Sequence, residues 1–242
     1  MPAGFVKTRA DAPPDFFTAE AKGLRWLGEV TPAGGPHVPR VLDVERHSIT
    51  IERVDTVPWS HAHDETFGRA LATLHRAGAS TFGAPWAGYI GPLPLDNTPS
   101  DDWEEFYATR RVEPYLDALD ERDRRTIRGV LDRIDQLSGP PEPPSRIHGD
   151  LWRGNVLASA DGRTWVIDPA AHGGHRETDL AMMRLFGGFG PRAYDAYDEA
   201  FPLGDGWRDR IALHQLHPLL VHVSLFGDAY REQAIAAARW YE

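Results

Sequence analysis

The sequence contains no cysteine among its 242 residues. That absence excludes disulfide bridges, thiol nucleophiles and cysteine-bound metal centres, and it suits a reducing compartment. Long apolar runs are also missing, since no stretch approaches the ~20 apolar residues that a membrane-spanning helix needs. From the opening residues Met1-Pro2-Ala3-Gly4 we expect no signal peptide. We therefore expect a cytoplasmic protein with no membrane partner.

Positive charge is scarce as well. The chain has 26 Lys and Arg residues against 36 Asp and Glu residues, which gives a formal net charge of −10. An acidic chain repels the phosphate backbone of nucleic acids and attracts cationic small molecules. We therefore expect no nucleic-acid partner.

Eleven histidines are present, but they do not form a recognisable metal-binding pattern. His61 and His63 could form a metal pair on a strand. His214, His217 and His222 do not share one helical face, and no cysteine completes a zinc set. Structural or surface roles are expected for all five.

One stretch, residues 146–155, organises the rest of the chain. It reads RIHGDLWRGN and is followed by two short apolar runs at 156–158 and 164–167. The Asp-Gly pair at 161–162 between these runs is typical of a β-hairpin turn. The hairpin is expected to bring the polar residues at its open end together.

Those polar residues are Asp150 and Asn155 before the first strand and Asp168 after the second. Two carboxylates and an amide are the groups that phosphoryl transfer needs. Asp150 would accept or orient the proton of the attacking hydroxyl, while Asn155 and Asp168 would hold Mg²⁺. Asn155 follows Asp150 by five residues, the spacing of the kinase catalytic loop.

The N-terminal region supplies candidates for nucleotide binding. Lys7 lies on a predicted strand and Glu20 on the helix that follows, the arrangement of the kinase ion pair that holds ATP phosphates. Backbone groups near Glu52 and Val54 would meet adenine. Either pair could also be ordinary surface residues, and the 146–168 motif is what favours a nucleotide role.

These patterns predict an α+β fold, and the family resemblance described below implies that it is a two-lobed protein-kinase-like fold. The smaller lobe, 1–55, would hold a small antiparallel sheet and one helix, and the mainly helical lobe, 56–242, would hold the catalytic β-hairpin. The expected elements are as follows: strands at 4–9, 40–45 and 48–54; helices at 15–30, 64–78, 103–116 with a kink near Pro114, 122–137, 179–187, 191–201, 207–226 and 228–241; and an extended surface segment at 79–100.

The chain also resembles the fructosamine-kinase (ketosamine-3-kinase) family. The resemblance covers nearly the whole chain, and its motifs include HGDLWxGN at 148–155, with Trp152 typical of the family, and GHRExDLA at 174–181. Further matches are FVK at 5–7, LAxLH at 71–75, LFGGF at 185–189 and LFG at 225–227.

This resemblance implies phosphorylation of a sugar hydroxyl on a ketosamine, such as a fructosamine, ribulosamine or glycated amine, with ATP and Mg²⁺ as cofactors. It implies that Asp150 is the catalytic base. His148 and Asp179 would brace the catalytic loop without taking part in the chemistry. Trp152, His175 and Glu177 are candidates for the substrate side of the site.

One departure from the family pattern bears on ATP. Family members usually carry two strands joined by a glycine-rich loop ahead of the lysine strand, whereas Phe5-Val6-Lys7 opens this sequence. Either the start of the sequence is truncated, or a shortened lobe works without this loop, or the protein binds nucleotide poorly; our working expectation is weak ATP binding. Two alternatives stay open: a kinase for another aminated acceptor such as an aminoglycoside, and a non-catalytic binding module. Trp152 and the 174–181 run argue against the first, and the intact Asp150, Asn155 and Asp168 argue against the second.

Overall fold

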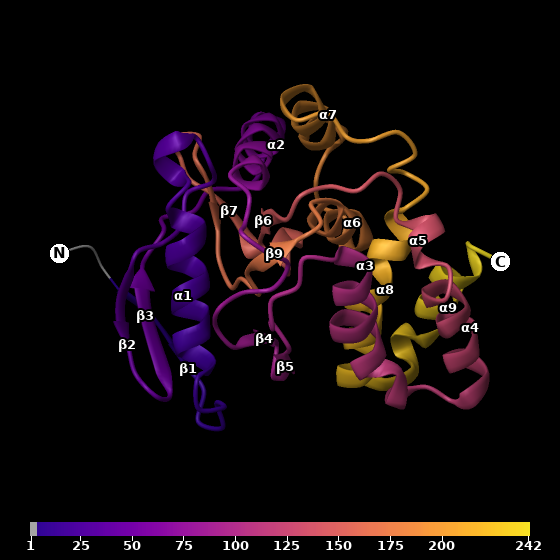
Figure 1. Ribbon diagram of the computed structural model, residues 1–242. Helices are drawn as coiled ribbons and strands as arrows, with labels where there is room; N and C mark the ends of the chain where they lie inside the picture. Colours follow the sequence, from indigo (N-terminus) through magenta and orange to yellow (C-terminus); the bar gives the residue numbers. More distant parts are fainter. Residues whose placement is uncertain (1–3) are drawn as a thin grey trace.

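The N-terminal part of the chain folds into a three-stranded antiparallel sheet backed by one helix, at the left of Figure 1. The strands are β1 (Gly4–Thr8), β2 (Val41–Val44) and β3 (Ser48–Glu52), in the order β1-β3-β2. Helix α1 (Phe16–Gly28) packs on this sheet. The computed structural model describes residues 4–242. Residues 1–3, on which the signal-peptide expectation and the start of the predicted small lobe fall, lie outside the described residues.

The small core between sheet and helix explains why these elements form together. Phe17 and Leu24 lie on one face of α1, and Ile49 and Ile51 alternate along the inner face of β3; all four are buried. Burial of each such side chain contributes about 1.5–3 kcal/mol. The apolar spacing in α1 and the alternation in β3 thus fix the two elements face to face.

The larger part of the chain is mainly helical, at the centre and right of Figure 1. Its helices pack around two apolar clusters, one formed chiefly by α3, α4, α8 and α9, the other by α2, α6 and α7 with the end of α1. The helices are α2 (His61–Arg76), α3 (Trp103–Tyr107), α4 (Glu121–Leu131), α5 (Ile134–Leu137), α6 (Glu177–Phe186), α7 (Pro191–Ala200), α8 (Ile211–Phe226) and α9 (Arg231–Arg239).

Two short antiparallel pairs carry the motif stretch. Strand β6 (Ser145–Ile147) delivers the chain to the loop and pairs with β9 (His172–Gly174). Strands β7 (Val156–Ala158) and β8 (Thr164–Val166) form the predicted hairpin, with Val156 opposite Val166. Its turn contains Gly162 at φ 81°, a left-handed conformation that glycine adopts without strain.

Several expectations about single elements are wrong. His61 and His63 lie in the first turn of α2, where the backbone N–H of Ser60 donates to Nδ1 of His63, and not on a strand. The 103–116 helix ends at Tyr107 and continues as a π turn and a 3₁₀ turn (Ala108–Val112, Glu113–Ala118). The 122–137 helix is interrupted between α4 and α5.

The segment 79–100 is not simply an extended surface stretch. It contains a hairpin of β4 (Gly88–Ile90) and β5 (Leu93–Leu95). Phe82, Ile90 and Leu95 are buried against the helical cluster, which holds the hairpin in place. Figure 1 shows this hairpin between α1 and the helical part of the chain.

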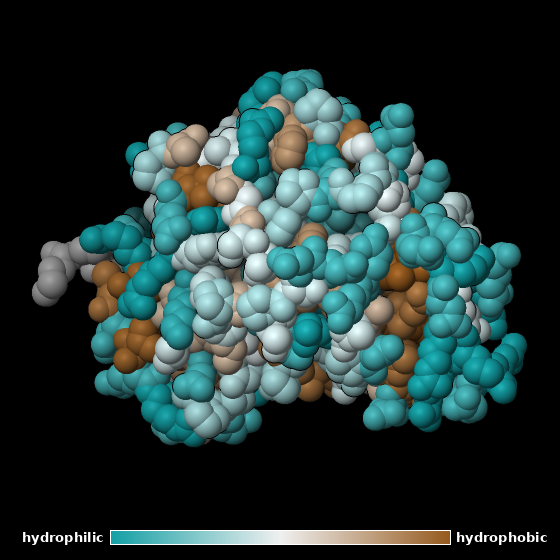
Figure 2. Space-filling model, in the orientation of Figure 1, coloured by the Kyte–Doolittle hydropathy of each residue, from teal (hydrophilic) through white to brown (hydrophobic). Residues whose placement is uncertain are grey.

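The outer surface is largely polar in the view of Figure 2, with apolar atoms at the left over the three-stranded sheet. Phe5, Val6 and Leu42 are among the exposed large apolar residues of that sheet. Within residues 4–242, no helix combines the length and the apolar character that crossing a lipid bilayer requires.

Candidate active site

The structure brings Asp150, Asn155 and Asp168 to one cavity, as the hairpin pattern predicts. We call it the central cavity; its volume is about 320 Å³, and Lys7 and Glu20 also line it. The side-chain amide of Asn155 donates to the backbone oxygen of Asp150 at 2.9 Å and to its Oδ2 at 3.0 Å. These two bonds fix the Asp150 carboxylate relative to the hairpin.

Lys7 joins the two lobes at this cavity. Its Nζ lies 2.6 Å from Oε1 of Glu20 on α1 and 2.6 Å from Oδ1 of Asp168 after β8. Burial alone would lower the pKa of Lys7, but the charges of Glu20 and Asp168 raise it above its usual value. Lys7 is therefore a fixed cation beside both carboxylates.

Asp168 has an unusual backbone conformation. Its φ is 56°, and among residues 4–242 it is the one non-glycine residue with a positive φ. Such a conformation costs roughly 1–3 kcal/mol and occurs mostly at functional sites. The neighbouring Pro169 restricts Asp168 further, and the result is a carboxylate that faces the central cavity and Lys7.

A buried carboxylate braces the catalytic loop. Asp179, fully buried on α6, accepts the backbone N–H groups of His148 (2.7 Å) and Gly149 (2.9 Å) and also contacts Nε2 of His75 at 3.1 Å. Burial would raise the pKa of Asp179, but the hydrogen bond from His75 and the nearby ring of His148 lower it. Asp179 stays ionised and holds the loop in shape.

His148 provides the second brace. Nε2 of His148 lies 2.9 Å from the backbone oxygen of Ile167, and its Nδ1 accepts the N–H of Asp150 at 3.2 Å. The ring therefore links the loop carrying Asp150 to the strand end carrying Asp168. The positions of His148 and Asp179 agree with the supporting role that the family resemblance implies.

Asp150 is half-buried in the central cavity. Burial raises the pKa of its carboxyl, although His148 and the hydrogen bond from Asn155 act in the opposite direction. A raised pKa makes an aspartate a better proton acceptor, which is what a general base requires. The Asp150 carboxylate is thus both positioned and chemically suited to take a hydroxyl proton.

A second cavity, which we call the sheet-side cavity, adjoins the central one. It measures about 510 Å³ and shares Lys7 and Asp168 with the central cavity. Its walls include the predicted Glu52 and Val54, together with the apolar side chains of Ile51, Leu157 and Ile167. Apolar walls beside a backbone edge suit a flat heteroaromatic ring, with phosphates directed toward Lys7.

The donor set of the central cavity suits a divalent cation with a preference for oxygen. Asp168 offers a carboxylate and Asn155 an amide, and both line the cavity. Hard cations such as Mg²⁺ prefer these oxygen ligands to imidazole. The residues present therefore fit Mg²⁺, which would be held by Asn155 and Asp168.

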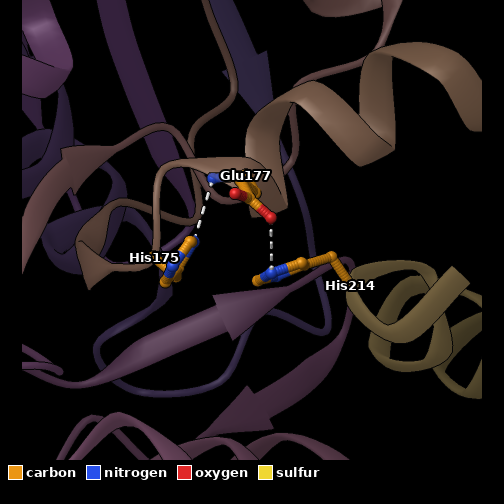
Figure 3. Close-up of side chains that lie close together, drawn as sticks. All are labelled: His175, Glu177 and His214. Carbon is orange, nitrogen blue, oxygen red and sulfur yellow. Dashed lines mark hydrogen bonds and ion pairs between the residues drawn. The ribbon is translucent and has the colours of Figure 1, made fainter. Parts of the chain in front are cut away.

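His175 and Glu177 do not lie on the substrate side, so this expectation is wrong. Both are buried, and neither lines the central cavity, the sheet-side cavity or a further cavity beside Asp150 and Trp152. Figure 3 shows them with His214, their ligand-type atoms within 4.8 Å of one another. Arg210 occupies both oxygens of Glu177, at 2.6 and 2.9 Å. A metal ion here would face that guanidinium, so the cluster is a structural ion-pair network.

Trp152 lies beside Asp150 at the central cavity, and its substrate-side role stays a prediction. It lines the central cavity and a third, aromatic cavity of about 350 Å³, and its side chain is partly exposed. The sequence did not identify the other residues of these walls. They include Trp86 and Tyr89 of the hairpin segment in the central cavity, and Phe186, His222, Phe226 and Tyr230 in the aromatic cavity.

A signal for some of these residues exists in the sequence. Phe186 and Phe226 each precede a glycine in the LFG motifs, and an apolar side chain at a helix end beside a glycine turn often faces a cleft. Trp86 and Tyr89 lie in a Gly- and Pro-rich stretch without periodicity, so nothing in the pattern marked them.

Comparison with known proteins places the chain in a family. The fructosamine kinase family model matches residues 3–239. A Thermus thermophilus protein named probable ketoamine kinase is 36% identical over 230 residues, covering 93% of this chain and 82% of the relative. The chloroplastic protein-ribulosamine 3-kinase of Arabidopsis thaliana is 32% identical, covering 96% of this chain and 74% of the relative.

Solved structures agree with the fold. A candidate fructosamine-3-kinase from Thermobifida fusca has a TM-score of 0.93 at 53% identity, over 98% of this chain and 84% of that one. An aminoglycoside phosphotransferase has a TM-score of 0.64 at 20% identity, over 98% of this chain and 85% of that one, which shows the shared fold alone. The two-lobed protein-kinase-like architecture is thereby confirmed. The chain belongs to the fructosamine kinase family and is a small-molecule kinase.

Proposed function

We propose that this kinase transfers the γ-phosphoryl group of ATP to a sugar hydroxyl of a ketosamine, a fructosamine or ribulosamine carried by a small molecule or a glycated amine. The observation that carries the proposal is the meeting of Asp150, Asn155, Asp168 and Lys7 in one cavity between the two lobes. These groups are the parts that phosphoryl transfer requires. The ketosamine acceptor is supported by membership of the fructosamine kinase family.

Each residue has a role that follows from its position. The Asp150 carboxylate orients the acceptor hydroxyl and takes its proton as the oxygen attacks phosphorus. Lys7, held by Glu20, binds the phosphates, and Glu52 and Val54 border the adenine. Mg²⁺ on Asn155 and Asp168 supplies neutralisation of the phosphate charge. Positioning and charge neutralisation therefore provide most of the catalysis.

The contact between Lys7 Nζ and Asp168 Oδ1 places the ammonium beside the carboxylate that would hold Mg²⁺, where the phosphates of ATP are expected. We further propose that the lobe boundary falls at 55/56 and that the enzyme is cytoplasmic, where ATP and Mg²⁺ are both available. We also propose that Ile167-Asp168-Pro169 stands where protein kinases carry the Asp-Phe-Gly motif, whose aspartate binds the metal ion.

The test is a magnesium–ATP assay on a panel of ribulosamines, fructosamines and aminoglycosides, with Asp150→Asn as the inactive control and a chelator arm to remove the metal. Phosphorylation of the ketosamines, abolished by the variant and by the chelator, is expected. Turnover of aminoglycosides alone would assign a different acceptor. No turnover of any acceptor would favour a binding module.

A further inference from the structure

The acceptor side of the active site has a second compartment, the aromatic cavity. It opens from the central cavity, because Gly91, Asp150 and Trp152 line both. Its remaining walls come from the end of α6, from α8 and from the turn after it, where aromatic rings gather. These rings belong to Trp152, Phe186, His222, Phe226 and Tyr230.

The rings form one connected wall. The ring centroids of Phe186 and His222 are 5.0 Å apart, those of His222 and Tyr230 are 4.7 Å apart, and those of Phe226 and Tyr230 are 6.0 Å apart. Trp152 meets Phe186 edge-on at 6.2 Å. The wall is therefore continuous from the residue beside Asp150 to the far end of α8.

The wall is also accessible. Phe186 is 37% exposed and Phe226 is 61% exposed, although both are large apolar side chains. Grouped exposed aromatics at a cavity mouth are typical of a ligand-binding groove. Isolated rings would carry no such meaning, but these rings line a cavity that begins at the catalytic carboxylate.

The charge of this compartment limits what it can hold. Three ionisable side chains line this compartment, those of Asp150, His222 and Tyr230. No lysine or arginine is among its lining residues. A carboxylate placed there would lie near the Asp150 carboxylate with no cation to pair with, which is unfavourable. An apolar or aromatic group would instead be buried against the rings.

We propose that the aromatic cavity binds the substituent on the amine of the ketosamine, and that it selects apolar or aromatic substituents and rejects those with a carboxylate close to the nitrogen. This inference rests on the proposed function and adds the class of amine. The preferred substrates are sugar adducts of alkyl or benzyl amines and of side-chain amines in peptides. Adducts of the α-amino group of free amino acids are disfavoured.

The experiment compares two fructose adducts that share the sugar and differ in the amine, benzylamine and glycine. For the wild-type protein, kcat/KM for the benzylamine adduct should exceed that for the glycine adduct by about tenfold or more, the usual range for an apolar-pocket contact. Phe226→Ser should lower the benzylamine value more than the glycine value, so that the ratio between the two adducts falls. Phe226→Arg should reverse the preference by supplying a cation for the carboxylate.

Trp240→Ser is the matched control. Trp240 is an exposed aromatic residue at the end of α9 and is 67% exposed, but it does not line the aromatic cavity. This variant should keep the wild-type ratio between the two adducts. Circular dichroism and thermal melts of each variant show whether it is folded.

The outcomes separate this inference from the proposed function. Equal kcat/KM for the two adducts in the wild type, unchanged by either Phe226 variant, would overturn the inference and leave the ketosamine kinase assignment standing. No turnover of either adduct or of the ribulosamines in the panel assay would overturn the proposed function. Calorimetric titration of both adducts gives a second readout, in which equal affinity would overturn the inference independently of turnover.

Discussion

Asp150 shows how function and stability oppose each other at one residue. Burial raises the pKa of its carboxyl, so the folded protein binds this proton more tightly than the unfolded chain does. Above the folded-state pKa the carboxylate must be ionised in a half-buried place, and folding is then less favourable than with a neutral group.

Asp150→Asn should therefore lose activity and gain stability. The kcat is expected to fall on the order of 10²-fold or more, because the amide cannot take the hydroxyl proton. The melting temperature at pH 7 should rise, and the gain should shrink as the pH falls toward the ordinary aspartate range near 3.9. Kinetics and thermal melts across pH measure both effects, and a melting temperature below that of the wild type would contradict the burial argument.

Asp150 should also set the acid side of the pH–rate profile. Since its pKa is raised, kcat/KM should decline with falling pH at a pH above the ordinary aspartate value, where the carboxylate becomes protonated. A profile measured with and without saturating ATP gives the position of this limb. An activity that stays constant down to pH 4 would show that another group is the base.

Gly154 has no side chain, and the ring of Trp152 occupies the space where a Cβ atom would lie. A Cβ atom at position 154 would lie 2.3 Å from Cη2 of Trp152, so any larger residue must displace the ring. Gly154→Ala should lower kcat/KM for a ketosamine with little change in the KM for ATP.

Gly129→Ala is the matched control, because Gly129 lies inside α4 with no atom within 4 Å of its added Cβ. That control should stabilise the protein by about 1 kcal/mol and leave activity unchanged.

At the scale of secondary-structure elements, the sequence predicted most where a local pattern was complete. The β7–β8 hairpin has two apolar runs, an Asp-Gly turn and flanking polar residues, and the structure contains it with Val156 opposite Val166. The amphipathic spacing of α1 placed that helix correctly. Both elements are determined by neighbours in the chain, which a sequence displays directly.

Elements that depend on distant partners were missed. The β4–β5 hairpin lies in a Gly- and Pro-rich segment with no clear alternation, and it is held by Ile90 and Leu95 packing on the helical cluster. Likewise, His175 and Glu177 lie next to a catalytic-loop brace in the sequence, but the partner that decides their role, Arg210, comes 33 residues after Glu177. Proximity in sequence therefore suggested a substrate contact where the fold makes a buried ion pair.

The N-terminus of α6 is where this ion pair acts. Burial would raise the pKa of Glu177, but the close contact with His214 and the hydrogen bonds from Arg210 lower it to about 2. A lowered carboxyl pKa stabilises the fold at any pH above its usual value of 4.5, and the contribution is lost as the pH falls toward 2. Glu177 thus contributes to stability at neutral pH, and it lines neither the central, the sheet-side nor the aromatic cavity.

Glu177→Gln should lower the free energy of unfolding by about 3 kcal/mol, because it leaves Arg210 buried without a charge partner. The KM values for both substrates should stay the same in the folded protein. Glu199→Gln, which removes an exposed partner of Arg192, should change stability little. Urea unfolding at pH 7 and at pH 3 measures the effect, and an increased KM without loss of stability would instead restore a substrate-side role.

At the scale of the whole molecule, the β4–β5 segment ties the two lobes together beside the central cavity. Trp86 meets Trp26 of α1 edge-on at 5.5 Å, and Tyr89 meets Phe16 of α1 at 5.3 Å. Trp86 and Tyr89, which line the central cavity, therefore pack on α1. The same helix carries Glu20, which holds Lys7. A change in either wall should therefore affect binding of both substrates.

A double-mutant cycle tests this connection. Trp26→Ala and Trp86→Ala should show a coupling energy of about 0.5–1.5 kcal/mol in unfolding experiments, the range for an aromatic pair. Trp86→Ala alone should raise the KM for ATP as well as for the acceptor. The pair Trp26→Ala and Trp240→Ala should be additive, and additivity in the first pair would show that the contact carries no energy.

The three adjoining cavities have a consequence for the order of events in turnover. The sheet-side cavity meets the central cavity at Lys7 and Asp168. The aromatic cavity meets it elsewhere, at Gly91, Asp150 and Trp152. Each also has a rim residue more than half exposed, Phe5 and Phe226. Two substrates can then enter and two products can leave by separate routes, without waiting for each other. Initial-velocity plots should intersect, as in a random sequential mechanism through a ternary complex, and parallel lines would instead indicate a ping-pong mechanism with a phosphorylated enzyme.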